Sequence, residues 1–224
     1  MAREVGGKLK FLGDGTAVDN LELDGMPPEL ARDYSVAGCT SPQVGGRSYN
    51  IPGGILSLPG LLELALNDGV HRATGLRLGA STGDPAEFSS FEEVWNAFAA
   101  QVRHVVPHCH AIKNGDKEVF SRYAPSPFQS ALCPPCIDSG TDVIDGGTAP
   151  FWSFALSAAG APNVGDGLMA IKRCVFEEKR FTMARLAEAL AADFEGYEDV
   201  RAMLLRAPKF GNGGPGGYGL LNDV

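Results

Sequence analysis

The stretch ELARDYSVAGCTSPQV, residues 29–44, decides the fold of this chain. Its centre, YSVAG, is a short run of β-favouring residues, and Cys39 follows directly after it. Glycines and prolines recur from Pro42 to Gly54 and predict a loop. In an α/β fold the carboxyl end of a strand opens into a shared crevice, so a cysteine there can meet a substrate. A small buried thiol is the competing interpretation, because no acid or histidine lies within three positions of Cys39.

Helical periodicity dominates the segments that follow. The clearest patterns predict a helix over 56–67, which ends at an Asp-Gly turn, and an amphipathic helix over 90–106, which begins with a capping box. Shorter patterns predict helices over 116–123, 152–160, 163–176, 181–193 and 197–205, and strands over 128–132 and 141–144. The residues before Pro27 are expected to be rich in loops, and Pro27 and Pro28 to begin a helical turn. Strands followed by helices favour an α/β layout with a buried parallel sheet.

Composition narrows the class of protein. The 224 residues include 27 acidic and 19 basic side chains, a formal charge of −8, and the basic ones are scattered, which argues against nucleic acid as a partner. No apolar run approaches the roughly 20 residues of a membrane-spanning helix, and residues 1–11 have no apolar core of a secretory signal. We therefore expect a soluble, cytoplasmic protein without a membrane partner. Five cysteines, an odd number in a chain of this length, favour free thiols over a disulfide framework.

Three further groups of residues suggest a metal, redox or substrate site less strongly, and each also has a structural explanation. Cys133 and Cys136 have the spacing of a metal or redox pair, but a single CxxC is poor support for zinc, and a small CxxC metal protein stays only an alternative. A cluster of histidines lies near the expected end of the helix over 90–106, and it could either bind a metal or interact favourably with the helix dipole. Its members are His104, His108 and His110, together with Cys109. Gly146-Gly147 is interpreted primarily as a turn, and the alternative is that the backbone there approaches a substrate cavity. No metal ligand is predicted.

Several separate blocks, in order along the chain, carry a resemblance to a known family. They are ELARDYSVAGCTSPQV, LLELALNDGV, FSSFEEVWNAF, SPFQSAL, CIDSGTDVIDGGT, the segment over 165–196, and LRAPKFGNG. Over residues 8–212 the chain resembles the carboxyl-terminal half of the barrel domain of a glycyl radical enzyme of the pyruvate formate-lyase-like superfamily. The resemblance implies an α/β fold, part of a ten-stranded barrel with helices packed outside. It also implies that Cys39 is the loop cysteine, which becomes a thiyl radical and abstracts hydrogen from a small organic substrate.

The resemblance implies further components that this chain does not contain. No cofactor is expected to be bound; a glycyl radical is expected elsewhere in the full enzyme, installed by an S-adenosylmethionine radical activase. The Arg-Val-x-Gly-Tyr type motif of the glycyl loop is absent, and Gly217-Tyr218-Gly219 resembles it only superficially because the preceding Arg-Val is missing. We expect a partial barrel domain over 1–210 and a flexible Gly-rich tail over 211–224. The expected partners are the activase, the rest of the barrel with its glycyl radical domain, and a second copy in a homodimeric full enzyme. A fragment of this kind is expected to be inactive alone.

Ser41 separates the subclasses of reaction. Many dehydratase, lyase and decarboxylase members have Glu two residues after the cysteine as a base, and a serine hydroxyl is a poor proton acceptor near neutral pH. The arrangement Cys39-Thr-Ser41-Pro42 is similar to that of members that add hydrocarbons to fumarate, with Arg47 as a candidate partner for the dicarboxylate. Ser41 and Arg47 are thus the candidate substrate-binding residues. A radical dehydratase, an arylacetate decarboxylase and a noncatalytic α/β remnant or partner subunit stay open as alternatives.

Overall fold

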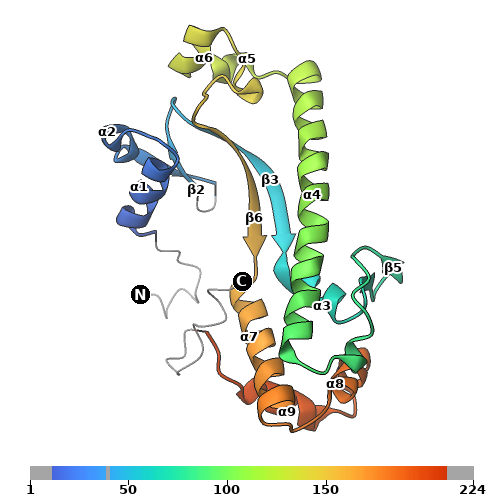
Figure 1. Cartoon of the computed structure of the whole chain (residues 1–224). Helices are drawn as coiled ribbons and strands as arrows, with labels where there is room; N and C mark the ends of the chain where they lie inside the picture. Colours follow the sequence, from blue (N-terminus) through green and yellow to red (C-terminus); the bar gives the residue numbers. More distant parts are fainter. Residues whose placement is uncertain (1–11, 39–40, 211–224) are drawn as a thin grey trace. The chain divides into compact units, whose positions relative to one another are not determined.

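The computed structural model describes residues 12–38 and 41–210, and the chain divides into two compact units (Figure 1). Unit 1 comprises Met1–Gly53 and Ile112–Ala155, and unit 2 comprises Gly54–Ala111 and Leu156–Val224. The predicted division at residue 210 falls at the edge of the described residues and stays a prediction. Within the described ranges, no helix combines the length and the apolar character that crossing a bilayer requires.

Unit 1 begins with two helices and a hairpin. These are α1 (Asp14–Leu23), α2 (Pro28–Ala31), β1 (Tyr34–Ala37) and β2 (Ser41–Val44). A small core joins them, because Leu21, Met26, Ala31 and Val44 are all buried in one cluster. The later part of the unit contains α5 (Pro127–Ser130), α6 (Pro134–Ser139) and the 3-10 turn η2 (Val143–Asp145). Short helices and tight turns thus make up most of this unit.

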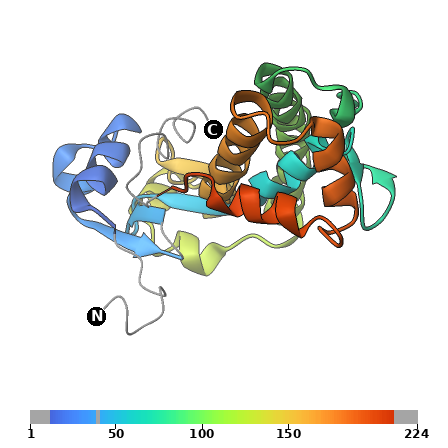
Figure 2. The ribbon, with the colours of Figure 1, turned by 90° about the horizontal axis from the view of Figure 1, so that it is seen from below.

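Unit 2 contains the larger core. Its remaining elements are α3 (Leu58–Ala65), β4 (Val70–His71), β5 (Leu76–Arg77), η1 (Pro85–Glu87), α7 (Ala161–Ile171), the π-helical turn η3 (Lys172–Glu177), α8 (Met183–Ala191) and α9 (Glu198–Arg206), and Figure 2 views the helices from below. Buried side chains from α3, α7 and α8 pack together, among them Leu61, Leu168 and Leu186. Gly160 precedes α7 with φ +86°, and a Cβ there would lie 2.5 Å from Pro59, so the close approach of α7 to α3 requires glycine.

Three long elements run through both units. They are β3 (Tyr49–Ser57), α4 (Phe91–Tyr123) and β6 (Trp152–Ala159). β3 and β6 form a two-stranded sheet, and Figure 1 draws their arrows pointing the same way, so this pair is parallel. The other two sheets, β1 with β2 and β4 with β5, are antiparallel hairpins. The parallel sheet expected from the sequence is thus present as one pair of strands.

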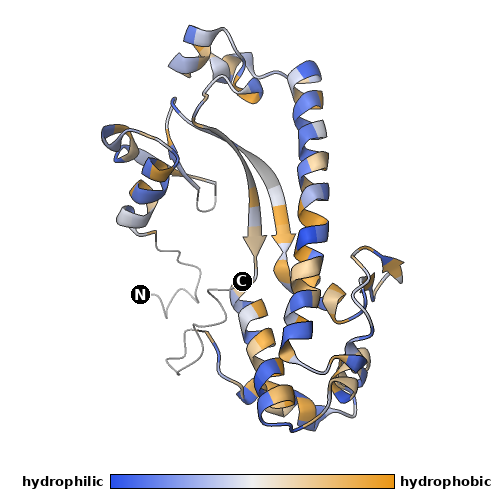
Figure 3. Ribbon diagram, viewed as in Figure 1, coloured by the Kyte–Doolittle hydropathy of each residue, from blue (hydrophilic) through white to orange (hydrophobic). Residues whose placement is uncertain are grey.

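The start of α4 confirms the predicted capping box. The Glu93 carboxylate accepts hydrogen bonds from the backbone N–H groups of Ser89 (2.5 Å) and Ser90 (3.2 Å), and the Ser90 hydroxyl accepts one from the Glu93 N–H (3.3 Å). The helix then continues for 33 residues, with Pro107 inside it. The helices predicted over 90–106 and 116–123 are therefore one helix, and Figure 3 shows hydrophobic and hydrophilic residues interspersed along it.

Several short-range predictions were wrong. Residues 152–160 form β6 rather than a helix, because pairing with β3 outweighs the helical spacing of a short apolar run. The predicted strands over 128–132 and 141–144 are the helix α5 and the turn η2; Pro127 begins α5, and the Asp142 carboxylate caps η2 by accepting from the Ile144 N–H (2.9 Å). The region expected to be loop before Pro27 contains α1, and the loop expected from Pro42 to Gly54 contains most of β2 and the first part of β3, because strand pairing outweighs the local turn formers. The helices over 56–67, 163–176, 181–193 and 197–205 and the strand at 34–37 are confirmed.

Candidate functional site

The hairpin of β1 and β2 carries the position predicted to be catalytic. Its register pairs Ala37 with Ser41, so only three residues, 38–40, connect the two strands. Cys39 and Thr40 lie outside the described residues. Gly38 has φ +58°, a backbone conformation that glycine adopts without steric cost, at the point where the chain leaves β1. The structure thus confirms the strand before Cys39, but the strand belongs to an antiparallel hairpin rather than to a buried parallel sheet.

Ser41 is fixed by a neighbouring amide. Its hydroxyl is half-buried and accepts a hydrogen bond from Asn50 Nδ2 at the start of β3 (3.2 Å). Arg47 lies in the turn between β2 and β3, where its side chain is exposed and its N–H donates to the Val44 carbonyl (3.1 Å). The two predicted substrate-binding residues therefore have different surroundings.

A cavity of about 360 Å³ opens beside β2. Its lining comes from α1 and the turn after it, from β2, from the start of β3 and from the residues before β6: Asn20, Leu21, Asp24, Met26, Ser41, Pro42, Gln43, Ser48, Tyr49, Asn50, Pro150 and Phe151. Ser41 is a member of this lining, and Arg47 is not. Most of the polar groups are neutral amides and hydroxyls, which can donate and accept hydrogen bonds, and Asp24 is the one charged residue of this described lining. The cavity suits a small, polar organic molecule.

Hydrogen bonds hold the walls of this cavity in place. The Tyr34 hydroxyl on β1 donates to the Asp14 carboxylate on α1 (2.6 Å) and ties the helix to the hairpin. The Ser48 hydroxyl accepts from the Val44 N–H (2.9 Å) and closes the turn after β2. The Tyr49 N–H donates to the Phe151 carbonyl (3.0 Å), which joins two lining residues. All of these contacts lie within unit 1.

Cys133 and Cys136 are buried behind the cavity. They form a small cluster with Val143, and Tyr49 and Ile144 pack against it. Burial, together with the neighbouring Cys133, raises the pKa of the Cys136 thiol. A Cβ on Gly147 would lie closest to the Thr141 carbonyl oxygen and 2.6 Å from Cys136 Sγ, and neither Gly146 nor Gly147 belongs to the cavity lining, so the close backbone approach here is to this turn and its thiol. In the described parts of the chain, no group of three or more His, Cys, Asp or Glu side chains is arranged to hold a metal ion.

The histidine cluster lies in the middle of α4, not at its end. His108 Nδ1 lies 2.7 Å from the His104 carbonyl, and the two rings are 4.9 Å apart between centroids. Both side chains are exposed, and they lie far from the last turn of α4, where a helix dipole would favour them. The predicted location at a helix C-terminus is wrong because the helix continues to Tyr123.

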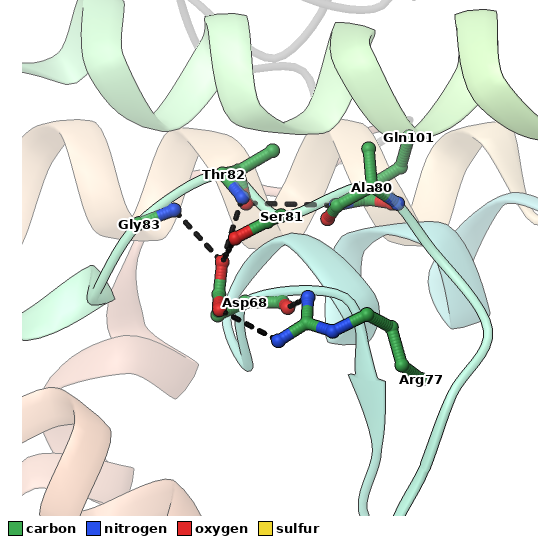
Figure 4. Close-up of polar contacts among 7 residues, drawn as sticks. All are labelled: Asp68, Arg77, Ala80, Ser81, Thr82, Gly83 and Gln101. Atoms are coloured by element: carbon green, nitrogen blue, oxygen red, sulfur yellow. Dashed lines mark hydrogen bonds and ion pairs between the residues drawn. The ribbon is translucent and has the colours of Figure 1, made fainter.

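Asp68, which the sequence predicts to lie in a turn, is the centre of a polar cluster that holds the segment after α3 (Figure 4). Asp68 Oδ1 accepts from the Ser81 hydroxyl (2.8 Å) and from the N–H groups of Thr82 (2.7 Å) and Gly83 (2.8 Å), while Oδ2 accepts from Arg77 (3.0 Å). The Ser81 hydrogen bond first, and then those of Arg77 and Gly83, hold the pKa of this carboxyl well below its ordinary value.

The fully buried Gln101 of α4 completes this cluster. Its amide donates to the Ala80 carbonyl (2.8 Å) and accepts from the Ala80 N–H (2.9 Å). The sequence signal was present, since Asn67-Asp68-Gly69 marks a turn and Gln101 is a polar residue on the apolar face of a helix. The interacting residues lie 9–21 positions apart, so spacing alone did not connect them. The cluster is structural, because all of these polar groups are used in holding the segment over 68–83.

Nearly the whole chain is similar to known proteins of one family. A family model described as "Pyruvate formate lyase-like" matches residues 1–215. The chain is 31% identical to trans-4-hydroxy-L-proline dehydratase of Clostridioides difficile, covering 95% of this chain and 27% of the relative, and 35% identical to isethionate sulfite-lyase of Oleidesulfovibrio alaskensis, covering 91% and 25%. The solved glycerol dehydratase of Clostridium butyricum superimposes with a TM-score of 0.89 at 31% identity, covering 99% of this chain and 28% of that one. The chain spans about a quarter of the length of these relatives.

Proposed function

Because the chain belongs to the pyruvate formate lyase-like family, we propose that it is the part of a glycyl radical enzyme that carries the hydrogen-abstracting cysteine, Cys39. Its fold is that of the matching part of a pyruvate formate-lyase-type α/β barrel. Its relatives include dehydratases, sulfite-lyases and the glycyl radical subunit of a decarboxylase. The observation that carries the proposal is that Cys39 belongs in sequence to the three-residue connection between β1 and β2, and that β2, which follows it, contributes Ser41 to a cavity with a polar lining.

The chemistry at Cys39 is hydrogen-atom transfer. A thiyl radical takes a hydrogen atom from a C–H bond of the substrate, so the S–H bond forms, the C–H bond breaks and the unpaired electron moves to carbon. No ionised thiol is needed, which fits the lack of an acid or histidine near Cys39 in sequence. Amide and hydroxyl groups in the lining, such as Gln43, Ser48 and Asn50, would orient the substrate without changing their own charge.

For the subclass of reaction, we favour elimination from a small, neutral or weakly charged substrate. Ser41 accepts a hydrogen bond from Asn50 and offers no carboxylate base, so an elimination at this site would proceed with departure of the leaving group that needs no prior proton removal by this residue. The described lining of the cavity has no Arg or Lys that would bind two carboxylates. The relatives found, dehydratases and sulfite-lyases among them, agree with lyase-type chemistry.

Addition to fumarate is the second candidate, and one specific observation favours it. Ser41 replaces an acidic residue, and addition to fumarate requires hydrogen abstraction but no base at this position. In that case Arg47, which is exposed and outside the cavity lining, would bind a fumarate carboxylate only after a rearrangement of the turn between β2 and β3.

The complete enzyme requires components beyond this chain. We propose that the remaining barrel and a glycyl radical domain complete the site, and that an S-adenosylmethionine radical activase installs the radical there. The glycyl radical would supply the oxidation that generates the thiyl radical on Cys39. We also propose a cytoplasmic location and a homodimer for the complete enzyme, and no activity for the segment by itself.

Turnover in the assembled enzyme tests the proposal. The chain is combined anaerobically with a polypeptide that supplies the remaining barrel and the glycyl loop, activated, and assayed with hydroxylated and sulfonated small substrates. Cys39→Ala should abolish turnover, whereas Cys109→Ala, a matched control in the half-exposed part of α4, should keep it. Retained turnover in Cys39→Ala contradicts the proposal, and a complete lack of turnover in the wild-type assembly favours the noncatalytic alternative.

Ser41→Glu separates the two subclasses. An elimination site should tolerate the added carboxylate or gain activity from it, because a base can assist departure of the leaving group. A fumarate-adding site should lose activity, since a second negative charge would repel the dicarboxylate. Ser48→Glu, at another lining serine, controls for the effect of charge alone.

A further inference from the structure

We propose that Cys133 and Cys136 are a redox-active dithiol that small disulfides, such as oxidised glutathione, convert to an intramolecular disulfide. The inference concerns the buried cluster of unit 1 and does not depend on the chemistry proposed for Cys39. Both cysteines are free thiols in the structure.

The backbone brings the two cysteines to bonding distance. The Cys136 N–H donates to the Cys133 carbonyl (2.9 Å), so residues 133–136 form a closed turn. The Cα atoms of the first and last residues of such a turn lie within about 7 Å, and disulfides span Cα separations of about 4.4–6.8 Å. Pro134 and Pro135, at the start of α6, fix the turn further because proline restricts its own φ. Both thiols belong to one buried cluster.

The surroundings of the pair select an intramolecular product. Cys133 is 7% and Cys136 3% exposed, and Val143, which is fully buried, packs against both. A lasting adduct with a bulky thiol would have to occupy this closed cluster, whereas a disulfide between the two sulfurs needs no added volume. Of the other described cysteines, Cys109 and Cys174 belong to unit 2, and neither has a second cysteine one turn away in sequence.

The reaction balances with one molecule of oxidised glutathione. The Cys133 sulfur, as thiolate, attacks the glutathione disulfide, so a mixed disulfide forms and one glutathione thiolate leaves. The Cys136 sulfur then attacks the Cys133 sulfur and expels the second glutathione. The protein loses two protons and two electrons, and glutathione gains both as two thiols. The protein is oxidised and the small disulfide is reduced.

Tyr49 connects the dithiol to the candidate site. Its side chain packs against the cluster of Cys133, Cys136 and Val143, and the residue also lines the cavity that contains Ser41. Burial first, and then the charges of Asp142 and Cys133, raise the pKa of Tyr49. The dithiol therefore lies one residue away from the lining of the cavity.

Mass spectrometry of the purified chain tests the proposal. The reduced, folded protein of residues 1–224 is incubated with millimolar oxidised glutathione, blocked with iodoacetamide and digested. We expect the peptide that contains Cys133 and Cys136 to lose two hydrogen atoms and carry no label, with this form about tenfold more abundant than a glutathione adduct at Cys109 or Cys174. Cys136→Ser should form no disulfide at this site and should accumulate little glutathione on Cys133, since the closed cluster disfavours a lasting adduct.

The same incubation in urea serves as the control for folding. In the folded chain the equilibrium constant for the disulfide should be about tenfold higher than in the unfolded chain, because the turn positions both sulfurs. Two labelled thiols after incubation of the folded wild-type chain, or a stable glutathione adduct at Cys133 in it, would overturn the proposal. Disulfide formation only in urea would overturn it as well.

Discussion

Replacement of Asp68 by alanine gives the sharpest test of the packing in unit 2. Its Oδ1 accepts three hydrogen bonds, from Ser81, Thr82 and Gly83, and the side chain is 32% exposed. A hydrogen bond to a charged group contributes about 1.5–3 kcal/mol when buried, and partial exposure reduces this to about 1 kcal/mol each. The exposed ion pair with Arg77 adds about 0–1 kcal/mol. We therefore expect Asp68→Ala to lower the free energy of unfolding by about 3 kcal/mol, roughly a hundredfold in the equilibrium constant.

Two further variants separate the contributions. Asp68 has φ +48°, a conformation that Asp and Asn tolerate better than Ala. Asp68→Asn keeps the backbone and an acceptor oxygen but removes the charge, so it should cost less, about 1–2 kcal/mol. Asp84→Ala removes one capping hydrogen bond, from the Ala86 N–H (2.9 Å), and should cost under about 1 kcal/mol.

Urea unfolding followed by the fluorescence of Trp95 measures these differences. Trp95 packs against the core of unit 2, and Trp152→Phe removes the other indole from the signal. Because the folded-state pKa of Asp68 is lowered, its stabilisation is fully present above the unfolded pKa of about 4 and is lost as pH falls through the folded pKa. The difference between wild type and Asp68→Asn should therefore shrink below about pH 4. An unfolding free energy for Asp68→Ala within about 0.5 kcal/mol of wild type would refute this reasoning.

Three more outcomes follow from single contacts. Gln101→Leu should cost about 2–4 kcal/mol in urea unfolding, because both backbone groups of Ala80 lose their partner in a buried site; an unchanged midpoint would contradict the assigned role. Gly147→Ala should cost about 1–3 kcal/mol by thermal unfolding, because its Cβ would lie 2.6 Å from Cys136 Sγ, and a neutral result would show that the turn relaxes. The raised pKa of Tyr49 means that its contribution is present below about pH 10 and is lost as pH rises through the folded pKa, so Tyr49→Phe should be less sensitive to alkaline unfolding than wild type.

The parts of the fold that the sequence predicted are those with local causes. The capping box at Ser90 and Glu93 forms within three residues and needed no knowledge of the rest of the chain. The leucines of α3 and the residues of α8 repeat on one helical face and pack into the core of unit 2. These elements were predicted correctly because periodicity and capping act over one or two turns.

The errors arose where distant contacts decide the local structure. Residues 152–160 have helical spacing, but pairing with β3, about 100 positions earlier, makes them a strand. The strands predicted over 128–132 and 141–144 were short apolar runs, for which Pro127 and the cap at Asp142 proved stronger signals than β-propensity. The buried amide of Gln101 could be identified only after α4 and the segment over 68–83 were seen together.

The candidate site was predicted in part. The strand before Cys39 followed from the sequence, whereas β2, which begins at Ser41, was expected to be loop because of its neighbouring prolines and glycines. The cavity was not predictable, because its lining combines α1, which the sequence did not indicate, with residues near position 150. Arg47 was predicted from its charge alone. In the structure its side chain is exposed and does not belong to the lining of the cavity.

The most direct test of the central claim is electron paramagnetic resonance of the activated assembly that contains Cys39→Ala. Cys39 is proposed to act after the radical is installed, so the variant should form the glycyl radical at the wild-type level while substrate turnover falls by about 10⁴-fold or more. The signal should then persist unchanged when substrate is added. Turnover close to that of the wild type, in an assembly with a normal radical signal, would contradict the assignment of Cys39 as the hydrogen-abstracting residue.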